Sequence, residues 1–140
     1  MKEYNLQRFV KAQQSDYETS LSEIRKGRKR SHWIWYIFPQ FKAFAHSRIA
    51  DYYGIEDKNE AEAFLQHPVL GQRIREISIA LLQHKSKDIN EIFGELDAGK
   101  VRSCMTMFDY LSPNDVFAQV LDTFYGGKRG GRTLKVLNGL

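Results

Sequence analysis

The sequence predicts an all-α fold, a compact multihelical single domain that spans residues 1–140. Apolar residues recur at steps of three and four over several long segments, which is the spacing of an amphipathic helix. The chain shows no strand–turn–strand pattern. It also contains no internal repeat and no low-complexity linker, and its 140 residues are enough to bury one core.

The first predicted helix covers residues 6–24 and stops before Gly27, a residue type that favours helix C-termini. The inward face of this helix carries Gln13 and Tyr17 among its apolar residues. A buried amide needs hydrogen-bond partners, so Gln13 is expected either to join an internal polar network or to face a cavity.

The next segment, Lys29–Gln40, reads KRSHWIWYIFPQ and combines cations, an imidazole and several aromatic rings. Ser31 is the expected N-cap of a short helix over residues 33–38. Pro39 disfavours helical geometry at the residue before it and so ends that helix. The apolar residues follow neither the strand nor the helix period, so the segment is expected to be buried on more than one side.

Further elements follow to the C-terminus. Pro68 suits the first turn of a long helix, and Gly94 suits the end of a short element. A turn at residues 112–115 and a glycine pair at 126–127 separate the last elements. The expected elements cover residues 48–53, 59–66, 68–83, 88–94, 95–111 and 116–125, with a final turn over 134–137.

The basic residues are concentrated in two places. The chain has 21 Lys and Arg against 17 Asp and Glu, which gives a formal net charge of +4. Eight of these cations lie in clusters at residues 25–30 and 128–132, and the remaining 13 are outnumbered by the 17 acidic residues. The positive charge is therefore local rather than spread over the surface.

The sequence favours a cytoplasmic protein that makes no membrane contact. No stretch approaches the roughly 18 apolar residues of a transmembrane helix, and the N-terminus lacks the apolar segment of a secretory signal. Cys104 is the single cysteine, so no intrachain disulfide can form. The four histidines are scattered, and neither HExxH nor CxxC occurs, so neither a metal site nor a cofactor is predicted.

The best candidate for a functional site is the polar front of the Lys29–Gln40 segment. Lys29, Ser31 and His32 directly precede Trp33. A cation, an imidazole that titrates near neutrality and a ring that stacks on planar groups suit an anionic, planar ligand, with His32 as the acid/base candidate. The alternative is structural: cations after a helix suit its negative C-terminal end, and the aromatic rings form core.

A second candidate wall is the polar face of the predicted helix at 95–111. Lys100, Arg102 and Ser103 could hold a phosphate or a carboxylate there. A solvated face with ordinary ion pairs is the competing interpretation. The glycine-rich segment 126–133 does not match GxxxxGK[ST] and follows no strand, so it is interpreted as a flexible basic turn.

Five segments match a known pattern in the same order over nearly the whole chain. They are LQRFVKAQ, GRKRSHWIWYIFPQ, HPVLGQRIRE, KVRSCMTMF, and FYGG followed by RTL. Together they resemble the bacterial domain-of-unknown-function 1810 family. The resemblance implies a compact multihelical single domain and no particular activity, substrate or cofactor. The positions that match the family's pattern include Gln13, Tyr17, Lys29, Ser31, His32, Trp33, Trp35, Gln40, Arg73, Lys100, Arg102, Ser103, Thr106 and Thr133.

Three functions are open at this point, as is the oligomeric state. The first is a small-molecule site, with an enzymatic role left open, for an anionic nucleotide-like ligand. The second is a nucleic-acid-binding protein that uses the basic clusters at 25–30 and 128–132. The third is a non-enzymatic interaction protein whose aromatic block docks a partner or a second copy of the chain. The ligand-binding residues of the first hypothesis are Gln13, Tyr17, Lys29, Ser31, Trp33, Gln40, Lys100, Arg102 and Ser103, with His32 as the acid/base group. In this hypothesis Gln13, Tyr17, His32 and Trp33 meet Lys29, Arg102 and Ser103 in one cleft.

Overall fold

The computed structural model describes residues 3–139 and confirms the all-α, multihelical fold. The described residues form no β-strand, only an isolated parallel bridge between Phe41 and Ile55. Within the same range, no helix is long and apolar enough to cross a membrane. The elements are α1 (Gln7–Arg25), α2 (Ile34–Ile37), the 3-10 helix η1 (Lys42–Phe44), α3 (Arg48–Tyr52), α4 (Lys58–Gln66), α5 (Leu70–Leu82), α6 (Ile89–Phe93), α7 (Glu95–Leu111), α8 (Val116–Tyr125) and α9 (Gly131–Leu137).

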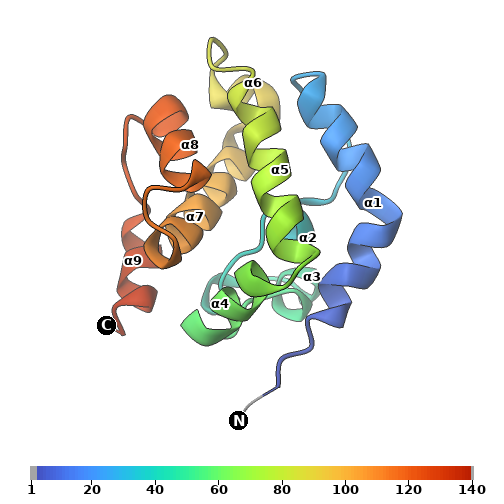
Figure 1. The fold of residues 1–140 in the computed structure, drawn as a ribbon, viewed down its shortest axis with the longest axis vertical. Coiled ribbons are helices and arrows are strands. Elements are labelled where there is room, and N and C mark those ends of the chain that lie inside the picture. The colour runs from blue at the N-terminus through green and yellow to red at the C-terminus, as the bar shows by residue number, and fades with distance from the viewer. Residues whose placement is uncertain (1–2, 140) are drawn as a thin grey trace.

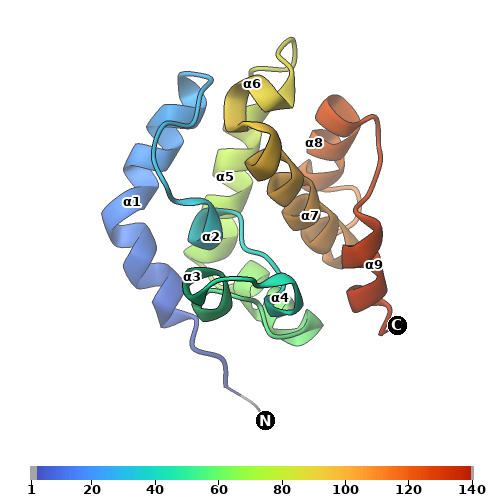
Figure 2. The same cartoon turned by 180° about the vertical axis from the view of Figure 1, so that it is seen from behind.

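Helix α5 lies in the middle of the bundle. It packs against α1 on one side and α8 on the other, and α4 also contacts it (Figure 1). Helix α7 packs against α4, α6, α8 and α9. The short elements α2, η1 and α3 cover the opposite face of the molecule, where they lie between α1 and the pair α7 and α9 (Figure 2). The segment of residues 38–47, which joins α2 to α3 and contains only the short helix η1, contacts α7 through Gln40.

A row of buried phenylalanine rings joins four helices through the core. The Phe9 and Phe64 ring centroids lie 5.1 Å apart, those of Phe64 and Phe108 5.4 Å, and those of Phe108 and Phe117 5.5 Å. All four side chains are fully buried. Ring pairs at such distances add about 0.5 to 1.5 kcal/mol each beyond the area they bury. The row therefore fixes α1, α4, α7 and α8 relative to one another.

Two local predictions are corrected around the Lys29–Gln40 segment and the C-terminus. Ser31 does not cap the short helix: α2 begins at Ile34, and its N-cap position is Trp33, which makes no side-chain capping bond. The Ser31 hydroxyl instead donates to Glu23 Oε2 at 2.6 Å, because the Glu23 carboxylate also accepts from Ser31 N and so holds this residue against α1. The final turn is a longer helix, α9, which starts at Gly131.

The segment that enters and leaves α3 is held by the isolated bridge. Ile55 N donates to Gln40 O, and Lys42 N donates to Ile55 O, both at 2.8 Å. Gly54 lies directly beneath this bridge: a Cβ built on it would be 2.6 Å from Lys42 Cα. Backbone atoms cannot move aside as a flexible side-chain end can, so only glycine fits here.

Replacing Gly54 with alanine is expected to lower the free energy of unfolding by about 1 to 3 kcal/mol, the usual cost of forcing extra atoms into packed structure. Urea denaturation followed by circular dichroism measures the change. Gly99→Ala is the matched control, since a Cβ at Gly99 in α7 meets nothing within 4 Å. Alanine at a helical position gains about 1 kcal/mol over glycine, so equal losses in both variants would contradict the role of the bridge.

Candidate functional site

A pocket of about 580 Å³ lies between the segment that follows α2 and the helices α7 and α9. Its volume lies within the roughly 300 to 1,000 Å³ of small-molecule sites. The predicted ligand-binding residues Gln40, Lys100, Arg102 and Ser103 line it together. The structure thus brings four of the predicted residues into one place, from two segments that are 60 positions apart in the sequence.

Cations line this pocket and carboxylates do not. Lys100, Arg102 and Arg132 contribute positive charge, and no Asp or Glu is present among the described residues of the lining. The guanidinium of Arg102 makes no ion pair or hydrogen bond with any described residue, although its charge lowers the pKa of Tyr125, which burial raises above its usual value. Arg132, like Arg102, forms no ion pair with a carboxylate of the described residues, and such cations beside a concave surface favour an anionic ligand.

Aromatic rings form the apolar part of the same pocket. Arg132 lies over the Phe44 ring, 4.4 Å from its centroid, and Lys100 Nζ lies 5.1 Å from that of Trp35. These cation–ring contacts hold the charged ends against the wall rather than in open solvent. Leu96 also lines the pocket and is 82% exposed, an unusual position for a leucine side chain. A bound planar group would cover part of this apolar surface.

Gln40 offers the pocket a polar group with unused capacity. Its side chain is 9% exposed, and its amide nitrogen donates to the carbonyl oxygens of Lys100, at 2.7 Å, and Phe38, at 3.0 Å. No described residue donates to the amide oxygen. The bond to Lys100 joins the segment after α2 to α7, and the amide oxygen is left to accept a hydrogen bond from a ligand.

Hydroxyl groups fix the start of α9, and with it Arg132. Ser103 Oγ and Thr133 Oγ1 are 2.5 Å apart, and Thr133 is almost fully buried. The Thr106 hydroxyl accepts from Gly130 N at 3.0 Å and donates to the Arg102 carbonyl at 2.8 Å. The run from Ser103 to Thr106 on α7 therefore positions the backbone that carries Arg132.

Lys29 lies next to the pocket but is engaged by other protein groups. Its Nζ pairs with Asp97 Oδ2 at 3.0 Å, donates to the Ser31 carbonyl and lies 5.1 Å from the Trp33 ring centroid. Asp97 also binds Lys100 Nζ at 3.2 Å. Since one carboxylate serves two lysines, this group keeps a net positive charge at the edge of the pocket.

Ser31 and Trp33 belong to a different polar group, which is centred on Glu23. The Glu23 carboxylate accepts from Arg30 N at 2.7 Å, Ser31 N at 3.0 Å and Trp33 Nε1 at 2.9 Å, in addition to the Ser31 hydroxyl. Burial alone would raise the pKa of Glu23, but these hydrogen bonds outweigh it and lower the pKa to about 2. Sequence reasoning did not identify Glu23, because an acidic residue near the end of a helix usually faces solvent.

Gln13 and Tyr17 join an internal network, one of the two arrangements expected for Gln13. Gln13 Nε2 donates to the Tyr36 carbonyl at 2.8 Å, and its Oε1 accepts from Arg73 at 3.4 Å. The Tyr17 hydroxyl donates to Glu76, and burial followed by this bond raises the pKa of Tyr17 above its usual value. The network ties α1 to α2 and α5 and does not reach the pocket beside α7.

His32 is exposed and lies outside the pocket lining. The predicted meeting of Gln13, His32 and Arg102 in one cleft therefore does not occur, because the Glu23 network holds the segment before α2 against α1. The imidazole that does line the pocket belongs to His46. Nothing in the sequence singled out His46 or Phe44, which lie in a segment without periodicity.

The two basic clusters do not form one surface. The first follows α1 and the second follows α8, and these helices lie on opposite sides of α5 in both views (Figures 1 and 2). In the second cluster, Arg129 is paired with Asp109 at 3.2 Å and lies 3.9 Å from Asp122. Trp33 is 1% exposed, so it is not available to dock a partner, whereas Trp35 is half-buried.

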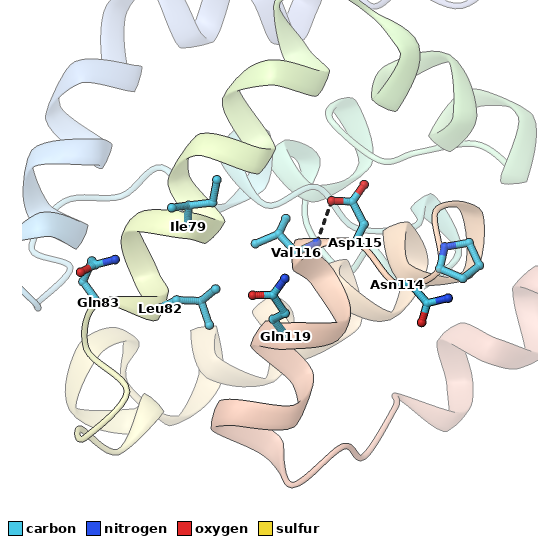
Figure 3. Close-up of a pocket in the computed structure, with 8 residues that line it drawn as sticks. Ile79, Leu82, Gln83, Asn114, Asp115, Val116 and Gln119 are labelled. Atoms are coloured by element: carbon cyan, nitrogen blue, oxygen red, sulfur yellow. Dashed lines mark hydrogen bonds between the residues drawn. The ribbon is translucent and has the colours of Figure 1, made fainter.

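A second depression, of about 610 Å³, lies between α5 and the start of α8 (Figure 3). Asp115 is the one charged residue among the described residues that line it, and its carboxylate accepts from Val116 N at 2.7 Å and Ser112 Oγ at 2.8 Å. Burial alone would raise the pKa of Asp115, but these bonds and Arg75 lower it. Because this charge caps α8, the depression offers less to a ligand than the pocket beside α7.

No cluster of three or more metal-ligating side chains occurs within residues 3–139. Cys104 is buried inside α7, and burial raises the pKa of its thiol well above the usual value. A buried thiol that stays protonated packs as a small apolar group rather than acting as a nucleophile.

Comparisons with known proteins agree with the fold but assign no activity. The model of a family described as a protein of unknown function (DUF1810) matches residues 3–137. The crystal structure of the conserved hypothetical protein Rv1873 from Mycobacterium tuberculosis is similar, with 40% sequence identity and a TM-score of 0.93. The similarity covers 96% of this chain and 97% of that one. No curated protein matches this sequence.

Proposed function

This chain belongs to the DUF1810 family of proteins of unknown function, and we propose that it binds an anionic, nucleotide-like small molecule in the pocket beside α7. One observation carries the proposal: Lys100, Arg102 and Arg132 line the pocket with no carboxylate among the described lining residues. Such a charge pattern suits a phosphate or carboxylate group.

The rest of the lining supports a ligand with a planar part. Trp35 and Phe44 provide ring faces, and each already stacks with a cation from the same pocket. A base or similar ring could lie against these faces while its anionic group meets the guanidinium groups. Gln40 adds a hydrogen-bond acceptor that distinguishes a ligand carrying an N–H or O–H donor.

If the protein also catalyses a reaction of its ligand, we assign the acid/base role to His46 rather than to His32. An imidazole acts on a bound ligand only within hydrogen-bond reach, and His46 lines the pocket while His32 does not. The His46→Ala variant should then bind the ligand but no longer turn it over.

A thermal-shift screen followed by calorimetry tests the binding proposal. Nucleoside mono-, di- and triphosphates, dinucleotides and inorganic phosphate are the probes, at low ionic strength. At least one nucleotide is expected to raise the Tm of the wild-type protein. Arg102→Gln and Arg132→Gln should each weaken its binding by about tenfold to hundredfold, because a hydrogen bond to a charged group contributes about 1.5 to 3 kcal/mol.

Lys11→Gln is the control, since Lys11 is an exposed cation of α1 that does not line this pocket. It should bind the nucleotide as tightly as the wild-type protein does. Failure of every nucleotide to bind, or equal affinity in the Arg102→Gln and wild-type proteins, would overturn the proposal.

A further inference from the structure

Two loops meet at the end of the molecule that lies farthest from the N-terminus. The loop after α1 and the loop between α5 and α6 are both at the top of the views in Figures 1 and 2. His84 Nε2 lies 3.1 Å from Arg25 O, and Lys87 Nζ donates to Gly27 O at 3.3 Å. A Cβ on Gly27 would come within 2.6 Å of Lys87 Nζ, so the two loops are in direct contact.

The contact joins two short basic segments into one surface, which we call the basic end. Its six exposed cations are Arg25, Lys26, Arg28, Arg30, Lys85 and Lys87. None of its six cations forms an ion pair with a carboxylate of the described residues. Lys29 is not part of it, since it turns inward to Asp97. The acidic residues nearby include Asp88, which caps α6, and Glu18 and Glu23, which share a groove with three of the cations. The Glu23 carboxylate accepts hydrogen bonds from Arg30 N and the Ser31 hydroxyl and forms no ion pair with these cations.

The helix end alone does not account for this charge. Cations near the C-terminus of a helix interact favourably with its dipole, which explains Arg25 and Lys26 at the end of α1. The effect fades within the last turn, so it does not extend to Arg28 and Arg30. Lys85 and Lys87 come from a separate loop. Like charges brought together without a carboxylate partner inside the protein indicate an external anionic one.

We propose that the basic end binds duplex nucleic acid through its phosphate backbone, without reading the base sequence. A duplex carries phosphate charges at regular spacing along its backbone, and several exposed cations on one surface can contact these phosphates at the same time. Single strands are held by stacking on exposed rings, but the rings next to this surface are internal, with Trp33 1% exposed. A membrane surface fits less well, because neither loop contains an exposed large hydrophobic side chain to insert.

This surface is separate from the proposed nucleotide pocket, and the two proposals fail independently. None of its six cations lines the pocket beside α7. It also differs from the surface expected from the sequence, since Lys85 and Lys87 replace the cluster at 128–132. That cluster lies on the other side of the bundle (Figures 1 and 2).

Fluorescence anisotropy with labelled duplex DNA and duplex RNA at several salt concentrations tests the proposal, with a single-stranded probe and phosphatidylglycerol vesicles in parallel. Both duplexes should bind at low salt with similar affinity whatever their sequence, and more tightly than the single strand. Binding should weaken as salt rises, with a log–log slope of about −3 to −5, since each neutralised phosphate contributes about −0.9.

The variant with Arg28, Arg30, Lys85 and Lys87 all replaced by glutamine should lose at least about tenfold in affinity, with a slope closer to zero by about 3. The control replaces Lys11, Arg48, Lys128 and Lys135, four cations exposed elsewhere, and should retain most of the binding. Circular dichroism checks that both variants fold.

Absence of duplex binding at low salt would overturn the proposal. So would equal losses in the two variants, tighter binding of the single strand, or binding to the vesicles but not to the duplexes.

Discussion

Replacing Arg8 with methionine is expected to lower the free energy of unfolding by about 3 to 5 kcal/mol, the largest stability effect among the described ion pairs. Arg8 Nη1 pairs with Glu60 Oε2 at 2.9 Å, and the two side chains are 8% and 3% exposed. Without the guanidinium, the Glu60 charge would stay buried with no cation beside it. The guanidinium carbon of Arg8 lies 4.3 Å from the Phe9 ring centroid, and methionine would place an apolar group against the same ring.

The same substitution should also lower the affinity of the pocket for its ligand, because Arg8 holds the backbone of residues 52–54 near the pocket. Its Nε donates to the Tyr52 carbonyl at 2.8 Å, and its Nη2 donates to the Gly54 carbonyl at 2.9 Å. The residue after Gly54, Ile55, forms the bridge that fixes Gln40 and Phe41. We therefore expect weaker nucleotide binding in Arg8→Met in addition to the lost stability.

Urea denaturation measures the stability effect, with Arg48→Met as the control because Arg48 is an exposed arginine in α3. The Arg8→Met/Glu60→Gln double variant should recover part of the loss, since it no longer buries an unpaired charge. A loss below about 1 kcal/mol in Arg8→Met, within the range of ordinary substitutions, would show that the pair does not stabilise the fold.

The helices could be predicted because each long one carries its own period of apolar residues. α1, α5, α7 and α8 were identified within a few residues of their observed bounds. The burial of Gln13 also followed from the sequence, whereas the choice between an internal network and a cavity did not, because an inward-facing amide can find its partners in either. These inferences need only the chain within one helix, where spacing alone determines which side chains share a face.

The pocket could be predicted only in part, for a physical reason. Lys100 and Ser103 are three positions apart on one helix and so share a face, and Arg102 directly precedes Ser103, so their proximity follows from spacing. Phe44 and His46 reach the same pocket through a segment whose position depends on the bridge to Ile55 and on a glycine beneath it. Contacts of this kind join residues that are far apart in the chain, so no local sequence pattern predicts them.

Glu23 was missed for the opposite reason, since its local sequence suggested a solvated side chain. The carboxylate is 9% exposed, and its acceptor capacity is used by amide, hydroxyl and indole donors that all come from the segment after α1. That segment has no period of its own. We infer that its donors, which need a common acceptor when buried, determine its path along α1.

Acid should destabilise the protein through Glu23. Its pKa is about 2 in the folded protein and 4.5 in a model peptide, so the folded state favours the carboxylate form. The resulting stability is present above about pH 5 and is lost as the pH falls toward 2. A shift of this size corresponds to about 3 kcal/mol. The free energy of unfolding should therefore decrease steadily over this range.

Replacing Glu23 with glutamine should lower stability at pH 7 by about 2 to 3 kcal/mol, because the Ser31 hydroxyl and the two amides lose a charged acceptor. The same variant should lose most of the acid dependence, since it no longer has a group to protonate there. Glu18→Gln is the control: Glu18 is an exposed residue of the same helix, and this variant should keep the wild-type profile.

Urea denaturation at steps between pH 2.5 and pH 7 measures how the free energy of unfolding of each variant depends on pH. Tryptophan fluorescence serves as a second probe beside circular dichroism. The fluorescence comes from both indoles of the chain, Trp35 and Trp33, and the Nε1 of Trp33 donates to Glu23. If Glu23→Gln retained the full decrease in stability toward low pH, other carboxylates would have to cause it. The Glu23 network would then not be what holds the segment between α1 and α2 in place.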